Sequence, residues 1–454
     1  MLASGGTWPM QRIVVNLAPA HLRKTGSGFD LAIAIALLTA SGRLEMRPST
    51  AWIGELSLDG RVRGVRGVLP AVATLRDAGI SRVVVPATNA GEAHLVDGVT
   101  IEPVEHLLRA IGLCDGSAEP LIVRRVDATP AASPIDDFAD VRGNDFAKRA
   151  LEIAAAGAHN LLLTGSPGAG KTMLARRVPG ILPPLDEPEA LEVTRIHSVA
   201  GLVPDGGGLV SIPPFRAPHH SVTVAGLVGG GGIAPIPGEV SLAHRGVLFL
   251  DELAEFARGA IQALRQPMEE GEVTVARSRW SVTFPARCII IAATNPCPCG
   301  WKDVREDVAC TCNPSQVDAY RSRLGGPVHD RIDLQVGVPP VTGDELLGDG
   351  DEEPSALIAQ RVAAARIRQR DRWAARGFRT NAELPARAIA TAASLSDAAQ
   401  RLVASAVDDD GLTGRAAHRV IRVARTIADL AERATVDTDE VREALTLRVG
   451  DRRG

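Results

Sequence analysis

Short apolar runs alternate with stretches of helical spacing in the N-terminal part of the chain. The runs RIVVNL (12–17) and RVVVPA (82–87) are strand-like. GFDLAIAIALLTASG (28–42) and VLPAVATLRDAG (68–79) have the length and spacing of helices. This alternation predicts an α/β domain over residues 1–114.

A linker separates this domain from a second α/β pattern. Residues 115–136 are rich in Pro, Ala and Ser and have no sustained period, which is typical of a linker. Residues 137–343 then contain three predicted strands, NLLLTG (160–165), GVLFLDE (246–252) and RCIIIAATN (287–295). The acidic stretch GDELLGDGDEEP (343–354) predicts a solvated loop. Residues 355–454 have a helical pattern, with 18 Arg against 13 Asp and Glu.

Composition agrees with a multidomain globular protein. A chain of 454 residues is too long for one core, and 45% hydrophobic with 23% charged residues is ordinary for such proteins. No apolar run is long enough to span a membrane, and the N-terminus lacks a signal-peptide pattern, so we expect no membrane partner and a cytoplasmic location. The net charge of −4 argues against a wholly basic nucleic-acid binder but leaves room for a local basic surface.

The segment NLLLTGSPGAGKT joins a buried strand to a phosphate-binding loop of the form GxxxxGKT. Its glycines let backbone N–H groups wrap a phosphate, and the helix that begins there directs its positive dipole end toward the anion. Lys171 is expected to reach the β and γ phosphates of ATP, and Thr172 to hold Mg²⁺. An accidental glycine-rich turn is the alternative, but the strand before the loop and the helix after it argue against that. The expected nucleotide-binding residues are Gly165, Ser166, Pro167, Gly168, Ala169, Gly170, Lys171, Thr172 and Asp251.

The two later strands end in polar residues that complete such a site. GVLFLDE ends in Asp251, which fits the ordering of Mg²⁺, and in Glu252, which fits a base that polarises the attacking water. A hydrophobic run that ends in DE is commonplace alone, and its position downstream of a phosphate loop makes it informative. Asn295, at the end of RCIIIAATN, is placed to orient the water from the opposite side, unless it only caps the strand.

Together with the helical C-terminal part, these three strand ends resemble an AAA+ ATPase. The finer resemblance is to the magnesium-chelatase-like AAA+ family that includes the competence protein ComM and its YifB relatives. It is carried by DFADVRGNDFAKRALEIAAAGAHNLLLTGSPGAGKT, FRAPHHSVTVAGLVGGG, PGEVSLAHRGVLFLDELAEF, AATNPCPCG, DRIDL and RVIRVARTIADL, which span most of residues 137–433. The PHH and CPCG elements are specific to this family. The resemblance implies a Lon-like (ribosomal S5-like) α/β domain, a P-loop AAA+ α/β core and a C-terminal helical lid.

The resemblance also implies two arginines that contact ATP. Arg331 in HDRIDL matches the arginine finger that, in such rings, enters the ATP site of the neighbouring subunit, so a homo-oligomeric ring, expected to be a hexamer, is implied. Without the family, an ion pair with Asp330 or Asp333 is the simpler interpretation. Arg415 in GLTGRAAHRV matches the sensor arginine of the lid, which contacts the γ-phosphate within its own subunit, and Arg419, one helical turn on, is a second candidate.

Two insertions are expected to project toward the pore of such a ring. GEVTVARSRWSVTFPAR predicts a β-hairpin with Arg277 and Arg279 near its tip, which suits sequence-neutral contacts to DNA phosphates. A solvated hairpin on the outside is the alternative. PFRAPHHSVTVAGLVGGGGIAPIPGEVSLAH contains His219 and His220, which offer pore contacts or metal ligands, although paired loop histidines more often do neither.

Residues 1–114 resemble a Lon-protease-like domain through GELSLDGRVRGVRGVLPAVATLRDAGISRVVVPATNAGEA. A Lon enzyme needs a Ser nucleophile activated by a nearby Lys. Here Gly28 stands where the Ser is expected, and the later run RGVLPAVA contains no Lys that would pair with it. Lys24 and Ser27 are neighbours but do not restore the Lon arrangement, so we expect no proteolysis. The chain also starts later than family members generally do, which leaves a misplaced start site or a partly unfolded N-terminal domain open.

Four of the six cysteines follow Asn295 directly, in NPCPCGWKDVREDVACTC: Cys297, Cys299, Cys310 and Cys312. In a reducing compartment, clustered cysteines indicate a metal before a disulfide. Four thiolates suit a structural, tetrahedral Zn²⁺ site, although the one-residue spacing is tighter than usual, and four unliganded thiols are the alternative. Cys114 and Cys288 are expected to be simply packed against their neighbours.

The leading functional hypothesis is an ATP-driven ring motor that acts on single-stranded or branched DNA. The resemblance implies a ComM-like helicase that promotes branch migration during recombination or natural transformation. The alternative is a chelatase motor that drives metal insertion into a tetrapyrrole, or remodels a protein partner, although chelatase motor subunits lack the Lon-like domain and the CPCG element. The complete set of ATP-site residues disfavours a non-enzymatic scaffold.

Overall fold

The computed structural model describes residues 12–18, 24, 26–119, 136–203, 207–231, 235–277, 280–304, 308–323, 326–348, 352–409 and 411–449. Contacts between residues define two compact units. Unit 1 comprises Met1–Ala131, Leu185–Ser211 and Gly231–Pro237, and unit 2 comprises Ala132–Pro184, Ile212–Gly230 and Gly238–Gly454. The helix α7 (Glu187–Ala200), which lies within the range expected for the ATPase core, therefore groups with unit 1.

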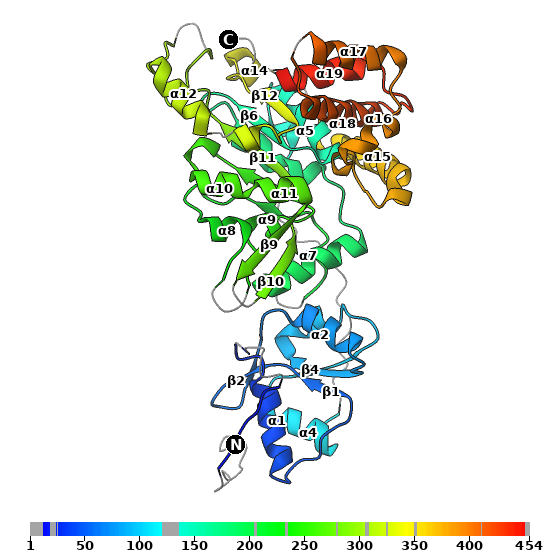
Figure 1. Ribbon diagram of the computed structural model, residues 1–454. Helices are drawn as coiled ribbons and strands as arrows, with labels where there is room; N and C mark the ends of the chain where they lie inside the picture. Colours follow the sequence, from blue (N-terminus) through cyan, green and yellow to red (C-terminus); the bar gives the residue numbers. More distant parts are fainter. Residues whose placement is uncertain are drawn as a thin grey trace. The chain divides into compact units, whose positions relative to one another are not determined.

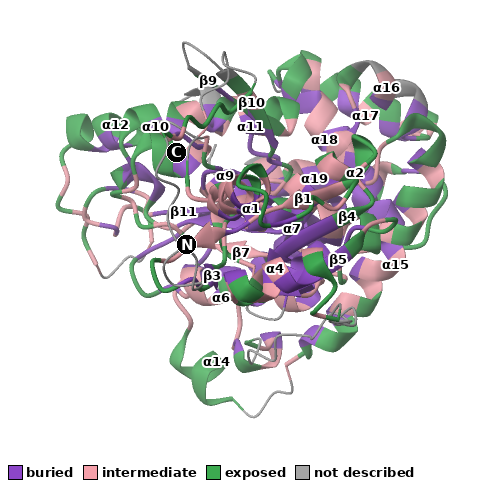
Figure 2. Cartoon of the chain, turned by 90° about the horizontal axis from the view of Figure 1, so that it is seen from below, coloured by how far each residue is buried: buried purple, intermediate pink, exposed green. Residues whose placement is uncertain are grey.

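Unit 1 is built on a parallel sheet in the order β1-β4-β5, accompanied by α1, α2 and α4 (Figure 1). Its strands are β1 (Thr50–Trp52), β4 (Arg82–Pro86) and β5 (Thr100–Val104), with β2 (Glu55–Leu56) and β3 (Val62–Arg63) as a short antiparallel pair. Its helices are α1 (Asp30–Ala40), α2 (Val68–Asp77), α3 (Ala90–Ala93), α4 (Leu107–Asp115) and α7, which contacts α2. β4 is buried from its second residue onward (Figure 2), which explains why its run of valines shows no polar alternation.

The strand predicted over residues 12–17 is wrong. This segment has no regular secondary structure, and Val14 and Val15 are 76% and 49% exposed. An apolar run forms a strand only where a neighbour satisfies its backbone N–H and C=O groups, and no strand in the described part of the chain pairs with it. The predicted helices and the other predicted strand of this region are present as α1, α2 and β4.

Unit 2 contains a five-stranded sheet in the order β12-β6-β11-β8-β7, in which every strand pair is parallel. Its strands are β6 (Leu161–Thr164), β7 (Phe215–Arg216), β8 (Val247–Leu250), β11 (Ile289–Thr294) and β12 (Leu334–Gly337). β6, β8 and β11 confirm the three predicted strands. Side chains of β11 alternate between two hydrophobic clusters, with Ile291 in one and Ile290 in the other, so this strand is covered on both faces. Because the strands are parallel, the carboxyl ends of β6, β8 and β11 lie at the same edge of the sheet.

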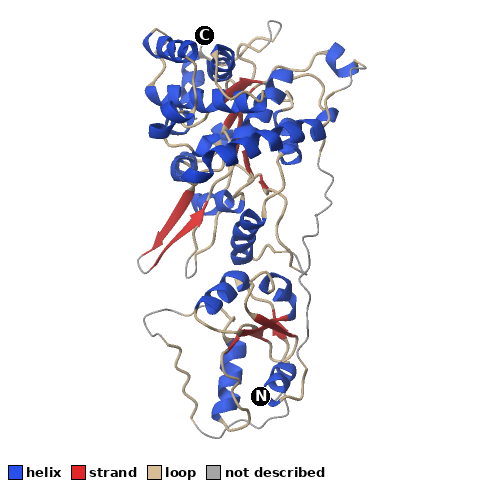
Figure 3. Ribbon diagram, turned by 90° about the vertical axis from the view of Figure 1, so that its right-hand side faces the viewer, coloured by secondary structure: helices blue, strands red, loops and turns tan. Residues whose placement is uncertain are grey.

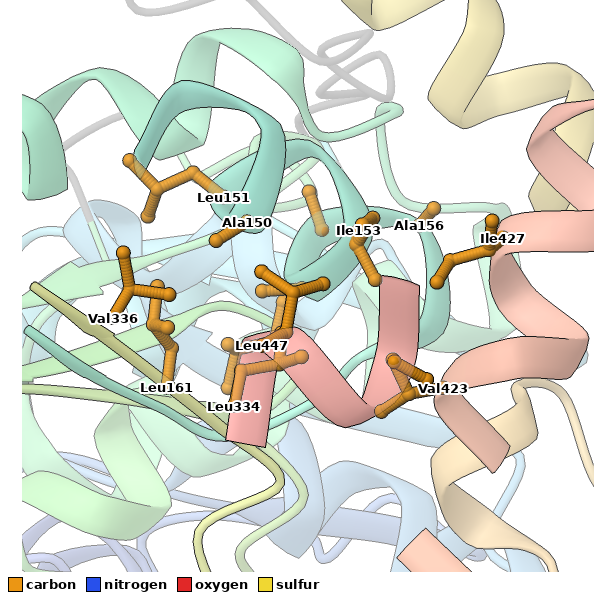
Figure 4. Close-up of a cluster of buried hydrophobic side chains, with 14 of the residues drawn as sticks. Ala150, Leu151, Ile153, Ala156, Leu161, Leu334, Val336, Val423, Ile427 and Leu447 are labelled. Carbon is orange, nitrogen blue, oxygen red and sulfur yellow. The ribbon is translucent and has the colours of Figure 1, made fainter. Parts of the chain in front are cut away.

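One of these clusters joins the sheet to the C-terminal helices, so the expected core and lid share a hydrophobic interior. The helices of unit 2 are α5 (Asp145–Gly157), α6 (Lys171–Arg177), α8 (Val224–Val228), α9 (Glu239–Leu242), α10 (Arg258–Ala263), α11 (Arg265–Glu270), α12 (Pro314–Arg323), α13 (Gly326–His329), α14 (Gly343–Leu347), α15 (Ser355–Trp373), α16 (Ala386–Ala392), α17 (Asp397–Asp408), α18 (Gly414–Leu430) and α19 (Thr438–Val449). α5 contacts both α15 and α18, and α19 contacts β12. Figure 4 shows Ile153 of α5, Leu334 of β12, Val423 of α18 and Leu447 of α19 in this cluster.

Short 3-10 helices complete the described secondary structure. They are Ala87–Asn89, Phe138–Asp140, Val178–Ile181, Leu253–Glu255, Ala374–Arg376 and Asn381–Glu383. The acidic stretch over 343–354, predicted as a loop, contains α14. Thr342 and Glu345 form a capping box there, which satisfies the first backbone N–H groups and starts the helix.

The predicted hairpin is present as β9 (Glu272–Arg277) paired antiparallel with β10 (Trp280–Pro285). The two strands extend as a long ribbon away from the neighbouring helices (Figure 3). Thr274 and Thr283 face each other across it, with their hydroxyl oxygens 3.0 Å apart. Arg277 is the last residue of β9, whereas Arg279 lies outside the described residues.

Candidate functional site

The phosphate loop connects the end of β6 to the start of α6, as the sequence predicts. Gly165 has no room for a side chain, because a Cβ atom there would lie 2.3 Å from the carbonyl oxygen of Val338. Gly168 and Gly170 have φ of +78° and +89°, which only glycine adopts without strain. The Ser166 hydroxyl is buried and has no hydrogen-bond partner among the described residues, so it is available to a phosphate oxygen.

Lys171 connects the phosphate loop to the end of β11. Its ammonium group donates to the carbonyl oxygens of Gly165 and Ser166, at 2.6 and 2.9 Å, and to Asn295 Oδ1 at 3.1 Å. Burial lowers the pKa of Lys171, while the negative charges of Asp251 and Glu252 act in the opposite direction. A buried cation with flexible reach beside a glycine-rich loop fits the phosphates of a nucleotide.

Thr172 and Asp251 form the second contact between these strand ends. The Thr172 hydroxyl donates to Asp251 Oδ2 at 2.6 Å. Hydroxyl and carboxylate oxygens are the ligands that Mg²⁺ prefers, so this pair fits a magnesium ion shared with bound phosphates. Asp251 also accepts, through Oδ1, a hydrogen bond of 2.9 Å from the backbone N–H of Glu252.

Glu252 has an uncommon backbone conformation and a partner that the sequence did not reveal. Its φ of +51° lies in the left-handed region, where non-glycine residues often mark functional turns. Its carboxylate Oε2 lies 3.5 Å from His220 Nδ1, and the side chain is otherwise largely exposed. The ring of His220 lies against that of His219, tilted by 36° with centroids 4.0 Å apart, and His219 Nδ1 lies 2.8 Å from the Ser221 hydroxyl. The paired histidines of the PHH element therefore lie beside the expected base, a role that spacing alone did not indicate.

The four clustered cysteines are brought together by the fold. Their sulfurs all lie within 4.8 Å of one another. Sγ of Cys297 lies 3.4 Å from that of Cys299 and 3.7 Å from that of Cys310, well beyond a disulfide bond. The other two cysteines are outside this group. Cys288 directly precedes β11 and is half-buried, and burial raises the pKa of its thiol to about 12.

The cysteine thiols of the cluster differ in pKa. The pKa of Cys299 is lowered to about 5, because the backbone N–H groups of Trp301 and Thr311 donate to its sulfur. The pKa of Cys310 is raised to about 12: the N–H of Cys312 favours its thiolate, but burial and the neighbouring thiols outweigh that contact. Thiols this close cannot all ionise without a cation, and a divalent metal would supply the missing positive charge.

Arg331, Arg415 and Arg419 form a separate cationic group. Arg331 is 5% exposed and pairs with Glu269 of α11. Burial raises the pKa of Glu269, but Arg331 and then the charges of Arg265 and Arg415 lower it, so that the pKa is lowered on balance. Arg419 contacts Asp333 at 3.2 Å.

Many arginines of the helical C-terminal part are neutralised within the chain. Arg372 and Arg425 both pair with the fully buried carboxylate of Asp429, at 2.6 and 3.0 Å. Arg361 pairs with two carboxylates, and Arg433 with one. The Arg-rich composition of residues 355–454 is therefore largely a structural feature and gives little support to a DNA-binding surface there.

The N-terminal unit lacks a Lon-type arrangement in the described residues around Gly28. The Ser27 hydroxyl donates to the carboxylate of Glu55. The Lys24 ammonium donates to the carbonyl oxygen of Leu17, at 2.9 Å. Neither contact activates a serine in the way that a Lon nucleophile requires.

Comparison with known proteins places this site in a family. Family models described as "Magnesium chelatase, subunit ChlI", "Subunit ChlI of Mg-chelatase" and "Magnesium chelatase, subunit ChlI C-terminal" match residues 137–346, 1–89 and 352–448. The chain is 46% identical over 447 residues to an uncharacterized protein of Mycobacterium tuberculosis, covering 98% of this chain and 88% of that protein. It is 40% identical to the competence protein ComM of Haemophilus influenzae (97% and 86% covered) and 39% identical to the uncharacterized protein YifB of Escherichia coli (100% and 88% covered).

These comparisons also include a match to a Lon protease. A stretch of 107 residues, 22% of this chain and 17% of the relative, is 28% identical to an archaeal Lon protease of Thermococcus kodakarensis. No helix in the described part of the chain has both the length and the apolar character needed to cross a bilayer. The matches over nearly the whole chain, with the α/β core that carries a phosphate loop, show that the chain belongs to the magnesium-chelatase-like AAA+ family that includes ComM and YifB.

Proposed function

We propose that this protein is an ATP-hydrolysing AAA+ ring motor that acts on DNA, as a ComM-like helicase in branch migration. The observation that carries the ATPase part is the contact network at the carboxyl ends of β6, β8 and β11. There, Lys171 contacts Asn295, and Thr172 contacts Asp251. Three strands far apart in sequence thus deliver the cation, the metal ligands and the polar amide to one edge of the sheet.

Each residue of this network has a distinct task in hydrolysis. Lys171 would neutralise the β and γ phosphates, and Thr172 and Asp251 would hold a Mg²⁺ ion, which would supply further positive charge to them. Glu252 accepts a proton from the attacking water, and Asn295 orients that water. His220 positions the Glu252 carboxylate, because its Nδ1 lies 3.5 Å from Oε2 of that residue.

The arginine group supports an active site shared between subunits. A finger residue must leave its own Glu269 and reach the γ-phosphate of the neighbouring subunit. For Arg415 the proposal keeps the role that the family pattern implies, a contact to the γ-phosphate within its own subunit. A hexameric ring in the cytoplasm is the assembly that this proposal expects.

Fewer observations support DNA as the substrate than support ATP hydrolysis. One relative that is 40% identical over 450 residues is named as a competence protein. The β9–β10 ribbon, with Arg277 at the end of β9, offers a projecting segment that suits contacts to phosphates. The alternative is a chelatase motor acting on a tetrapyrrole or a protein partner, and it is favoured by the description of the matching family models.

We also propose that Cys297, Cys299, Cys310 and Cys312 bind one structural Zn²⁺. Four thiolate ligands complete a tetrahedral shell and leave no open position for a substrate. The lowered pKa of Cys299 favours one thiolate in advance of the metal. Zinc content of the purified protein, measured by mass spectrometry, tests this part of the proposal.

The ATPase rate with and without forked or single-stranded DNA, at low and at high salt, tests the whole proposal. Stimulation that weakens as salt rises supports a DNA track, because phosphate contacts release counterions. A rate that DNA leaves unchanged removes DNA as the substrate and favours the tetrapyrrole or protein alternative, which binding of a porphyrin or capture of a partner would then distinguish. A Lys171→Ala protein, as control, is expected to lack hydrolysis under every condition.

A further inference from the structure

The cysteine cluster touches the phosphate loop through a single glycine. Gly300 follows Cys299 and has φ of +85°. A Cβ atom at this position would lie 2.5 Å from Cδ and 2.9 Å from Cγ of Pro167, which is the third residue of the phosphate loop. The glycine of CPCG is therefore required for two reasons: its backbone conformation, and the close approach of the proline ring.

The sulfur positions suit a metal that would fix this contact. Four sulfurs about 2.3 Å from one tetrahedral Zn²⁺ lie about 3.8 Å from each other. The described separations are 3.4 to 3.7 Å for the pairs formed by Cys297, Cys299 and Cys310. The backbone N–H of Cys299 also donates to the sulfur of Cys312, at 3.4 Å, so the turn that carries Gly300 is held by the second cysteine pair.

A second path links the cluster to the same site. Cys297 is fully buried and lies two residues after Asn295, the residue that accepts a hydrogen bond from Lys171. On the other side of the cluster, α12 carries Tyr320, whose hydroxyl lies 3.4 Å from the hydroxyl of Thr294. The segment that bears the four cysteines is thus attached at both ends to the strand end that faces the nucleotide.

We propose that zinc bound by the four cysteines maintains the phosphate loop in its nucleotide-binding conformation, through the contact between Gly300 and Pro167. This inference rests on the proposed ATP and zinc sites, and it adds that ATP binding depends on the bound zinc. Removing the metal frees the turn at Gly300, removes the support for Pro167, and weakens ATP binding without altering any residue that touches ATP.

Two variants separate the metal from the contact. Cys310→Ser removes one ligand at a position outside the phosphate loop, and is expected to lower zinc content and weaken binding of a fluorescent, non-hydrolysable ATP analogue by about tenfold or more, the usual range for losing an outer support. Gly300→Ala keeps all four thiols and is expected to retain zinc with a similar loss of affinity. Adding Pro167→Ala to Gly300→Ala removes the ring that the new methyl group meets, and is expected to restore part of the affinity.

Controls keep the outcomes distinct. Cys114→Ser changes a cysteine of unit 1 and is expected to leave zinc and ATP binding as they are, while Lys171→Ala is expected to keep zinc and lose ATP binding. If Cys310→Ser does not fold by circular dichroism, stripping zinc from the wild-type chain with a thiol-reactive mercurial, while the analogue is bound, tests the same dependence. Unchanged ATP affinity in the metal-free protein and in Gly300→Ala overturns the proposed dependence. A wild-type chain that binds no zinc overturns it through the metal site, and a Lys171→Ala chain that still binds ATP refutes the ATP site itself.

Discussion

Replacing Glu252 with glutamine tests the proposed general base with the smallest change in shape. The side chain is 59% exposed, and the ion pair in which it takes part joins it to His220 over 3.5 Å. A half-exposed pair of this kind contributes at most about 1 kcal/mol to stability, so Glu252→Gln is expected to fold as the wild type does. The positive φ of residue 252 is retained, because glutamine has the same branching as glutamate at Cβ.

The expected effect on turnover is much larger. Loss of a positioned general base typically lowers the rate by about 10²–10⁴-fold, which corresponds to about 3–5 kcal/mol in the activation free energy. ATP binding should persist, because Lys171, Thr172 and the loop glycines are unchanged. Single-turnover hydrolysis and titration with a fluorescent ATP analogue measure the two quantities separately.

A matched control distinguishes the base from a general loss of negative charge. Glu255→Gln neutralises an exposed carboxylate three residues further on and is expected to hydrolyse ATP at close to the wild-type rate. A Glu252→Gln protein that turns over at nearly the same rate as Glu255→Gln would refute Glu252 as the base. An equal loss of ATP binding and hydrolysis would show instead that Glu252 supports the nucleotide and not the chemical step.

Three further predictions concern His220, Arg331 and Asp429. His220→Ala is expected to slow hydrolysis, by less than Glu252→Gln does, while leaving ATP affinity unchanged; a loss of affinity alone would contradict a positioning role. Arg331→Ala is expected to abolish hydrolysis, and mixing it with a Lys171→Ala protein should restore some active sites; the absence of rescue in mixtures would count against a finger acting between subunits. Asp429→Ala leaves two paired arginines, one of them fully buried, without their shared carboxylate. It is expected to destabilise unit 2 by about 3–5 kcal/mol in urea unfolding. A loss below about 1 kcal/mol would show that these ion pairs stabilise the fold no more than exposed surface pairs do.

The sequence was most informative where local pattern and chemistry coincide. β6, β8 and β11 are short and apolar because both faces of the sheet are covered, and each ends in the polar residues that meet at one edge. The phosphate loop was predictable because the local backbone geometry requires its glycines. Gly168 and Gly170 have positive φ, and the carbonyl of Val338 lies beside Gly165. The hairpin was predictable because strand alternation and pairing act over a few residues.

Sequence patterns failed where a residue depends on a distant partner. The run over 12–17 is as apolar as a strand, but a strand requires a pairing neighbour, which no local pattern reports. His220 meets Glu252 only because β7 and β8 are adjacent in the sheet, although thirty residues of insertion separate them along the chain. The ion pair of Arg331 with Glu269 joins α11 to the segment before β12, a contact that the neighbouring Asp330 and Asp333 gave no reason to expect. The approach of Gly300 to Pro167 is of the same kind.

The two groups of charged residues in unit 2 together explain why hydrolysis should require more than one copy of the chain. One group, at the ends of β6, β8 and β11, is the one proposed to hold the phosphates, the metal and the water. The other includes Arg331, which pairs with Glu269 and must leave that carboxylate before it can contact a phosphate. Because Arg331 is buried, its ion pair is costly to break unless a better anion replaces Glu269, and the γ-phosphate of a neighbouring subunit is proposed as that anion. Because Arg331 would exchange its own Glu269 for that phosphate when the next subunit docks, assembly and catalysis are expected to switch on in one step.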